Sequence, residues 1–216
     1  MLLLAFDTAT SAVTVALHDG DHVIARTTTS AVRQHGEFLA ASIAALLSGA
    51  GAATADLTAV AVGTGPGPYT GLRAGLVTGR VLASALRIRA DGVCSLDVIA
   101  LAAAAESGGR EFLVATDARR KEVYWARYSP AGERLGGPEV GRPAQLPAGY
   151  PVAGEGPVLY SELAAEPIGP RYPDAGWLAE ISAKRQAAGA PAAALEPLYL
   201  RRPDAREPGK PKRVTP

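Results

Sequence analysis

The sequence has very few of the side chains that build disulfides, metal centres or membrane spans. Its 216 residues include one cysteine, Cys94, and three histidines, His18, His22 and His35. A single cysteine excludes an internal disulfide and a cysteine-based zinc site, and His35 has no other histidine or cysteine at metal-ligand spacing. No apolar run approaches the roughly 20 residues of a membrane helix, and the start MLLLAFD lacks the basic region of a signal peptide. These absences predict a cytoplasmic globular protein without a metal.

What is present suffices for a folded core, because 48% of the residues are hydrophobic and 20% are charged. The net charge of +1 hides an asymmetry. From Arg201 onward, six basic residues face two acidic ones, so this segment carries +4 and the preceding 200 residues carry −3. Four prolines in 201–216 indicate an extended, flexible tail. The tail either aids solubility or acts as an arm that contacts nucleic acid electrostatically.

Hydrophobic patterning predicts a first α/β lobe over residues 1–107. The first three strands are expected to form an antiparallel meander, with a fourth strand parallel to the first. Strands are expected at 2–6, 12–18, 22–28 and 57–62, with a brief one from Val93, and helices at 34–47, 72–86 and 97–105. This order predicts a mixed sheet flanked by helices.

The pattern restarts after Gly108-Gly109. Strands at 111–116 and 122–128 share the layout of the N-terminus, in which a buried strand ends at an Asp and a short turn leads to a second strand. The sequence therefore predicts an internal duplication and a smaller second lobe, 108–200, whose last segment could pack back on the first. Its other elements are expected to be a weak strand at 152–153 and helices near 157–165 and 175–188.

Two polar turns are candidate anion sites. In the first, Asp7-Thr-Ala-Thr-Ser11, successive N–H groups and three hydroxyls could converge on a phosphate, with Asp7 positioning a metal-bound water or a charge. Asp7, Thr8, Thr10 and Ser11 could instead form hydrogen bonds within their own turn. The second turn, DARRKE at 117–122, is either a solvated hairpin or an anion site.

The segment GTGPGPYTGLR at 63–73 is rich in glycine and proline and leads into a helix. It is not a P-loop, because no Gly-Lys-Ser/Thr follows the glycines, and its prolines do not suit a dinucleotide fingerprint. Glycines permit tight turns, prolines stiffen them, and Thr70 is the expected helix N-cap. Such a rigid loop suits contact with a partner or substrate.

Three further features have a structural and a functional interpretation. Gly75 and Gly79 form a small-residue stripe, which serves either packing inside the lobe or a subunit interface. Cys94 has no base nearby in the sequence, so a buried structural role is expected rather than a nucleophile. His35 is expected to be a surface or capping residue.

Taken together, these segments resemble a known family. The opening LLAFDTATS with VTVAL, the loop GPGPYTGLR, the segment DARRKEVYWA and the late PLYLR at Pro197–Arg201 occur in the order seen in the TsaB family. The sequence is identified as a member over about residues 2–201. The resemblance implies an actin-like, ribonuclease-H-like ATPase fold of two related lobes, with mixed β-sheets flanked by helices.

The resemblance also implies a function, that of the dimerisation subunit of the bacterial tRNA threonylcarbamoyladenosine machinery. Such a subunit is a non-catalytic scaffold for the catalytic paralogue TsaD and the ATPase TsaE, and a homodimer when alone. The complex transfers threonylcarbamoyl to the adenosine beside the anticodon. The resemblance therefore implies that this chain contacts tRNA indirectly, through the complex. TsaD carries a pair of metal-binding histidines, whereas this sequence has only His35 in the corresponding region. No catalytic residue, no metal and no tightly bound ATP or ADP is therefore expected.

The family's helical interface corresponds to residues 34–47 and 72–86 of this sequence. The residues expected in it are Gly67, Tyr69, Thr70, Arg73, Gly75, Leu76 and Gly79. The turn at Asp7 is then a vestigial phosphate turn. Two other classes remain open, an actin-fold kinase or hydrolase that acts alone and a tRNA-binding module that uses the basic tail.

Overall fold

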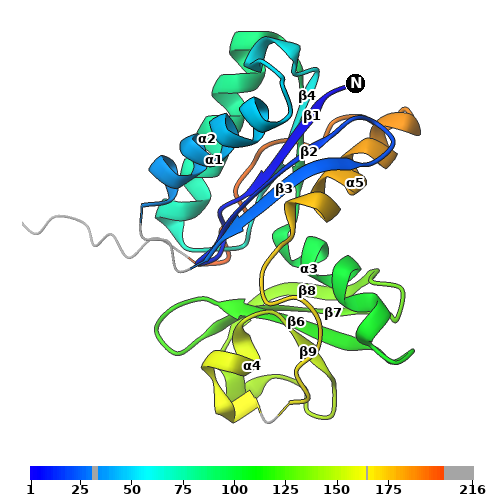
Figure 1. Ribbon diagram of the computed structural model, residues 1–216. Coiled ribbons are helices and arrows are strands. Elements are labelled where there is room, and N and C mark those ends of the chain that lie inside the picture. Colours follow the sequence, from blue (N-terminus) through cyan, green and yellow to red (C-terminus); the bar gives the residue numbers. More distant parts are fainter. Residues whose placement is uncertain (31–33, 164, 202–216) are drawn as a thin grey trace, which may run out of the picture.

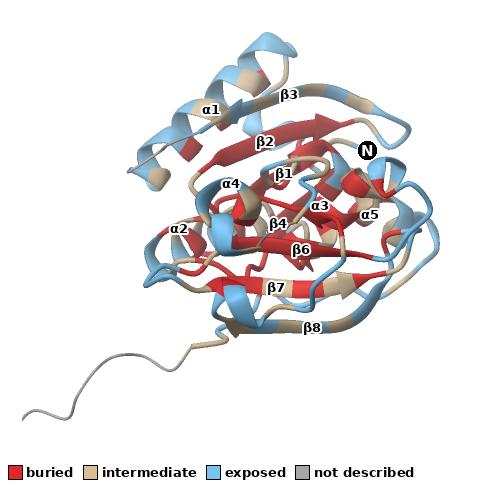
Figure 2. Cartoon of the chain, turned by 90° about the horizontal axis from the view of Figure 1, so that it is seen from below, coloured by how far each residue is buried: buried red, intermediate tan, exposed pale blue. Residues whose placement is uncertain are grey.

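The first sheet is built around a strand that is apolar up to its last residue. The computed structural model, which describes residues 1–30, 34–163 and 165–201, places this strand, β1, at Leu3–Asp7 with every residue buried. It pairs antiparallel with β2, Val13–His18, and parallel with β4, Ala59–Gly63. With β3, Val23–Thr29, and β5, Arg89–Val93, the sheet has the order β3-β2-β1-β4-β5. Every residue of β1, β2 and β4 is buried, whereas the residues of edge strand β3 are exposed or half-buried (Figure 2). The core therefore runs through the middle of the sheet.

Helices cover both faces of this sheet. α1, His35–Gly49, and α2, Tyr69–Leu86, lie side by side on one face, and α5, Ala175–Ala187, lies on the other (Figure 1). α3, Ser95–Ala103, lies between the two sheets, with Val98 in the core beside α5 and its other buried apolar residues in the core of the second sheet. None of the helices in the described part of the chain combines the length and apolar character that a membrane span requires.

The second sheet repeats the first. β6, Phe112–Asp117, pairs antiparallel with β7, Val123–Tyr128, and parallel with β9, Val152–Ala153. β8, Arg134–Gly141, completes the order β8-β7-β6-β9, which matches β3-β2-β1-β4 in sequence order and direction. The predicted duplication of the opening hairpin is thereby confirmed, as is the predicted α/β fold with two mixed sheets flanked by helices.

The short elements complete the second lobe and its connections. α4 spans Gly156–Leu159, and single 3₁₀ turns lie at Thr54–Asp56, Ala104–Glu106, Pro143–Gln145 and Ser161–Leu163. The helix predicted at 157–165 is interrupted, because Tyr160 has an extended backbone at φ −131° and ψ 96°.

Two other predictions were wrong in detail. α2 begins at Tyr69 with Pro68 at the N-cap, so Thr70 lies inside the first turn and does not cap the helix. β8 was not predicted, because its Gly136-Gly137-Pro138 segment is typical of a loop, although an edge strand tolerates proline. Apart from Arg201, the predicted basic tail lies outside the described residues.

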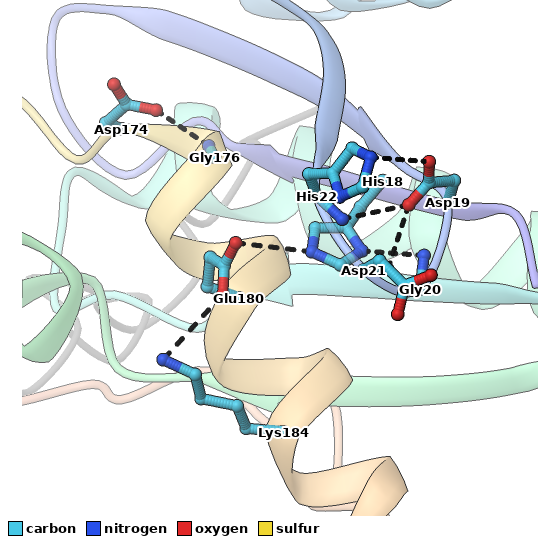
Figure 3. Close-up of polar contacts among 9 residues, drawn as sticks. All are labelled: His18, Asp19, Gly20, Asp21, His22, Asp174, Gly176, Glu180 and Lys184. Atoms are coloured by element: carbon cyan, nitrogen blue, oxygen red, sulfur yellow. Dashed lines mark hydrogen bonds and ion pairs between the residues drawn. The ribbon is translucent and has the colours of Figure 1, made fainter.

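α5 returns the end of the chain to the first sheet, where polar contacts fix it (Figure 3). Asp174 caps the helix by accepting a hydrogen bond from the N–H of Gly176 at 2.7 Å, and it pairs with Arg26 at 3.0 Å. On buried His18, Nδ1 accepts from the N–H of Gly20, which assigns the proton to Nε2, 3.4 Å from a carboxylate oxygen of Glu180. The last segment predicted for the second lobe therefore packs against the first sheet.

Candidate functional site

The carboxylate of Asp7 lies at the end of β1 and is enclosed by the chain. Asp7 is buried, and its Oδ1 accepts a hydrogen bond from the N–H of Ala9 at 2.7 Å. Its Oδ2 accepts a hydrogen bond from the hydroxyl of Ser95 at 2.5 Å. Burial raises the pKa of Asp7 above its ordinary value of 3.8, while the hydrogen bonds from Ser95 and Ala9 oppose that shift. Both carboxylate oxygens thus have partners within the chain.

The two threonines of the turn also use their hydroxyls inside the protein. The Thr8 hydroxyl donates to the carbonyl oxygen of Gly71 at 2.8 Å, and Thr10 Oγ1 accepts from the N–H of Ala12 at 3.2 Å. Both threonines are buried. The alternative to a phosphate site was that these side chains form hydrogen bonds within their own turn, and the hydrogen bonds of Thr8 and Thr10 lie within or near it.

Ser11 joins the turn to the second lobe. Its hydroxyl donates to a carboxylate oxygen of Glu155 at 2.9 Å, across 144 positions of sequence. Glu155 is buried, and its burial raises the pKa of the carboxyl group. In its ionised form this carboxylate would repel a phosphate held by the turn.

The glycine-rich loop closes over the turn at backbone distance. A Cβ on Gly67 would lie 2.1 Å from the carbonyl oxygen of Ala9, and one on Gly71 would lie 2.6 Å from that of Thr8. Only glycine permits so close an approach. The loop therefore packs directly against the carbonyl groups of the turn. Gly67, predicted as an interface residue, is buried in this contact.

The small-residue stripe of α2 faces the sheet of its own lobe. A Cβ on Gly75 would lie 2.4 Å from Thr8 Oγ1, and one on Gly79 would lie 2.5 Å from Val62 Cγ2. Leu76 is buried beside them. The expectation that Gly75, Leu76 and Gly79 contact another subunit is therefore wrong, because these residues allow α2 to approach β1 and β4 closely.

The opposite side of α2 is exposed and carries two valines as well as Arg73 and Arg80. Val77 and Val81 are 57% and 60% exposed, and Phe38 on neighbouring α1 is 42% exposed. Alanines 41 and 45 of α1 are exposed as well. Both helices cover the same face of the sheet (Figure 1), and we call the surface with these five exposed side chains the α1–α2 face. Apolar residues gathered on a surface mark interaction sites.

A second exposed cluster surrounds the start of α2, where three predicted interface residues, Tyr69, Thr70 and Arg73, are exposed. The ring of Tyr69 stacks on Tyr199 with centroids 5.2 Å apart, and the guanidinium of Arg73 lies 3.7 Å from the Tyr69 centroid. Arg73 also donates to the hydroxyl of Tyr199 at 3.0 Å. The N–H of Leu198 donates to the carbonyl oxygen of Thr64, which fixes the late PLYLR segment against the loop.

This cluster forms one wall of a cleft of about 640 Å³ between the lobes. The other walls are the turn after β6 and the end of the PLYLR segment, including Arg119, Arg120 and Arg201. In that turn, Arg119, Arg120 and Lys121 all have left-handed backbones, with φ of 62°, 56° and 60°. Such a conformation costs about 1–2 kcal/mol for each L-residue, yet the turn carries three long basic side chains and no glycine.

The remaining reactive side chains do not form a catalytic set. Burial raises the pKa of Cys94 to about 12, so its thiol is a poor nucleophile at neutral pH. His35 Nε2 lies 2.9 Å from the carbonyl oxygen of Thr10 and thus helps to hold the turn. Within residues 1–30, 34–163 and 165–201, no three His, Cys, Asp or Glu side chains gather as metal ligands.

Comparison with known proteins relates this geometry to a family. A family model described as TsaD, tRNA N6-adenosine threonylcarbamoyltransferase, matches residues 22–205. Uncharacterised protein Rv3421c of Mycobacterium tuberculosis is 44% identical over 212 residues, which are 94% of this chain and 93% of the relative. A Pseudomonas aeruginosa crystal structure described as similar to peptidase YEAZ has a TM-score of 0.79 at 30% identity, and the match covers 93% of this chain and 99% of that one. The chain belongs to the TsaB/YeaZ-type family.

A curated relative shares a shorter region with this TsaB/YeaZ-type chain. The tRNA threonylcarbamoyladenosine biosynthesis protein TsaB of Escherichia coli is 37% identical over 128 residues, which are 59% of this chain and 55% of the relative. The resemblance inferred from the motifs is therefore confirmed.

Sequence reasoning missed the exposed valines of this TsaB/YeaZ-type chain, although a signal for them was present. Val77 follows Gly75 by two positions, which is about 200° around a helix, so glycines on the buried side place Val77 and Val81 outside. The cleft of about 640 Å³ could not be predicted in the same way, because its walls come from segments far apart in the sequence.

The enclosure of Asp7 predicts a pH-dependent difference between the protein and its Asp7→Asn variant. Because the folded state raises the pKa, it holds a proton that the unfolded chain has released at pH values just above 3.8. The free energy of unfolding of the wild type should therefore fall, relative to Asp7→Asn, as the pH rises through that range, and the difference should level off above the native pKa. Urea unfolding from about pH 4 to about pH 8 measures it, and a constant difference would contradict the raised pKa.

The packing of the α2 glycines predicts that Gly75→Ala weakens the fold itself. The added methyl group would overlap Thr8 Oγ1, which should cost about 1–3 kcal/mol of unfolding free energy. Gly36→Ala in α1 is the matched control, because no atom lies within 4 Å of the position that its added methyl group would take. That control should alter stability by about 1 kcal/mol at most. Equal thermal midpoints for the two variants would show that Gly75 does not pack on the turn.

Proposed function

We propose that this chain is a non-catalytic subunit of tRNA threonylcarbamoyladenosine biosynthesis, which binds and activates a TsaD protein through its α1–α2 face. The observation that carries the proposal is this exposed apolar face, which lies on a chain of the TsaB/YeaZ-type family. The similarity to proteins named TsaB supports a role in tRNA threonylcarbamoyladenosine biosynthesis, and the exposed face supports assembly with a partner.

The absence of a reacting set among the described residues supports a non-catalytic role. Asp7 and Ser95 are bonded to each other, and Cys94 is a buried thiol with a raised pKa. A phosphate at the turn would have to displace the glycine-rich loop from its contact with the backbone at Ala9. We therefore propose that the chain holds no metal and does not bind ATP or ADP tightly by itself. For the same reason, a kinase or hydrolase that acts alone is the weaker hypothesis.

The size of the face suits a helical interface. α1 and α2 have 15 and 18 residues, so they are about 22 and 27 Å long and offer several helical turns each to a partner. A partner with a similar pair of helices could pack against them as a four-helix arrangement. We therefore propose that the chain forms a homodimer through this face when it is alone, and that a second copy and TsaD compete for it.

Activation follows from pairing if the TsaD protein exists in more and less active arrangements. A partner that binds one arrangement more tightly shifts the population toward it, without contributing a catalytic group. We include the ATPase TsaE in the same assembly, with tRNA as the substrate that the complex modifies, and we propose the cytoplasm as its location.

The proposal predicts that Val81→Asp abolishes pairing and leaves the monomer folded. The variant places a charge in the middle of the α1–α2 face, where pairing would bury it without a partner. Val158→Asp on α4 is the matched control, because Val158 is 61% exposed and Val81 is 60% exposed. Co-purification with TsaD and nucleoside analysis of tRNA, in cells that depend on this chain, should show loss only for Val81→Asp. Retained pairing and normal tRNA modification with Val81→Asp would exclude this face as the interface.

A further inference from the structure

Two hollows with basic linings lie next to each other, one between the lobes and one on the second lobe. The cleft of about 640 Å³ has Arg73, Arg119, Arg120 and Arg201 in its lining. A second hollow of about 330 Å³ is lined by Lys121, Arg142 and Tyr160, among others. Arg120 belongs to both linings, so the hollows adjoin at the turn after β6.

The charge of this surface contrasts with that of the rest of the chain. The two linings contain six basic residues, and the acidic residues in or beside them are Asp117, Glu122 and Glu162. Residues 202–216 hold five of the 22 basic and two of the 21 acidic residues, so 17 basic and 19 acidic residues remain in 1–201. A region with twice as many basic as acidic groups therefore lies on a body that is acidic elsewhere.

Ion pairs within the region leave it net positive. Arg119 pairs with Asp117 at 3.2 Å, and Arg201 pairs with Glu122. Glu162 lines the second hollow, so among the described residues of this region the acidic groups are fewer than the six basic ones. A positive hollow of this kind attracts an anion or a polyanion.

Aromatic rings accompany the cations. Tyr69 and Tyr199, which stack on each other, are 49% and 43% exposed, and Arg73 lies over the Tyr69 ring. Tyr124 lines the same cleft. Exposed rings offer surfaces on which nucleic acid bases stack, and guanidinium groups bind phosphate oxygens in pairs. Cations and rings in one groove are typical of sites for single-stranded nucleic acid.

We propose that these two hollows, called here the Arg–Tyr groove, bind a strand of RNA directly. The phosphates would follow the basic turn at 119–121, and a base would stack at Tyr69 and Tyr199. A strand is favoured over a free nucleotide, because the cations extend through both hollows and one nucleotide would occupy only the cleft. The chain also continues from Arg201, at the rim of the cleft, into a sequence with five more basic residues. Choosing RNA as the polyanion rests on the proposed function, in which tRNA is the substrate.

The test measures binding of a fluorescent, unmodified tRNA transcript to the full-length protein, without TsaD, over a series of salt concentrations. The groove variant is the triple substitution Arg119→Gln, Arg120→Gln and Lys121→Gln. Loss of two or three phosphate contacts should weaken binding roughly 30- to 100-fold near 0.1 M salt and flatten the salt dependence. Arg87→Gln is the matched control, because Arg87 is also exposed and left-handed, at φ 56°, but lies at the end of α2. Circular dichroism and thermal midpoints establish that the variants are folded.

The expected result is loss of binding for the groove variant and wild-type binding for Arg87→Gln. Equal binding by the wild type and the groove variant would overturn the proposal, as would no binding by the wild type even at low salt. A full-length variant with Arg202, Arg206, Lys210, Lys212 and Arg213 changed to Gln separates the tail from the groove, and loss with this variant alone would also overturn the proposal. If AMP binds in the cleft and tRNA does not, the site is one for free nucleotides and the proposal fails.

This outcome can be distinguished from failure of the proposed function. A chain that binds no tRNA by itself, yet still pairs with TsaD and supports tRNA modification, would refute the groove and leave the proposed function intact.

Discussion

The contact between the glycine-rich loop and the turn after β1 is the constraint on which the rest of the structure depends. Here the backbone at Gly67 and Gly71 meets the backbone at Ala9 and Thr8 at distances that exclude any side chain. The same turn holds Asp7, whose carboxylate receives the Ser95 hydroxyl from the start of α3. One small polar region thereby joins β1, the loop, α2 and α3. The proposal that no phosphate binds at this turn rests on this contact.

Closing the turn determines what α2 can present to other molecules. Gly75 and Gly79 draw the helix onto the sheet, which turns Val77 and Val81 outward beside Phe38 of α1. The same loop places Tyr69 and Arg73 at the rim of the cleft, opposite the basic turn of the second lobe. The α1–α2 face and the Arg–Tyr groove thus both depend on how α2 is placed on the sheet. The proposed pairing would use the later part of α2 and the proposed RNA contact its start, so both could occur together.

Much of this was predictable from local sequence. Alternation and turn residues located β1, β2, β3, β6 and β7, and the repeated layout of strand, Asp, turn and strand revealed the duplication. β8 was missed because its glycines and proline mask an edge strand. The contact residues of α2 were assigned to the wrong side, because a glycine stripe fits a close approach to a sheet as well as to another helix. The cleft depends on residues 73, 119 and 201 meeting in space, which no local pattern encodes.

We propose that this TsaB/YeaZ-type chain acts by assembly and has no nucleotide site of its own at the Asp7 turn. Calorimetric titration of the isolated, full-length protein with Mg-ATP is the direct test. We expect no saturable binding, because the loop packs against the turn and both oxygens of Asp7 have partners. A dissociation constant in the micromolar range that is lost in Asp7→Asn would contradict it.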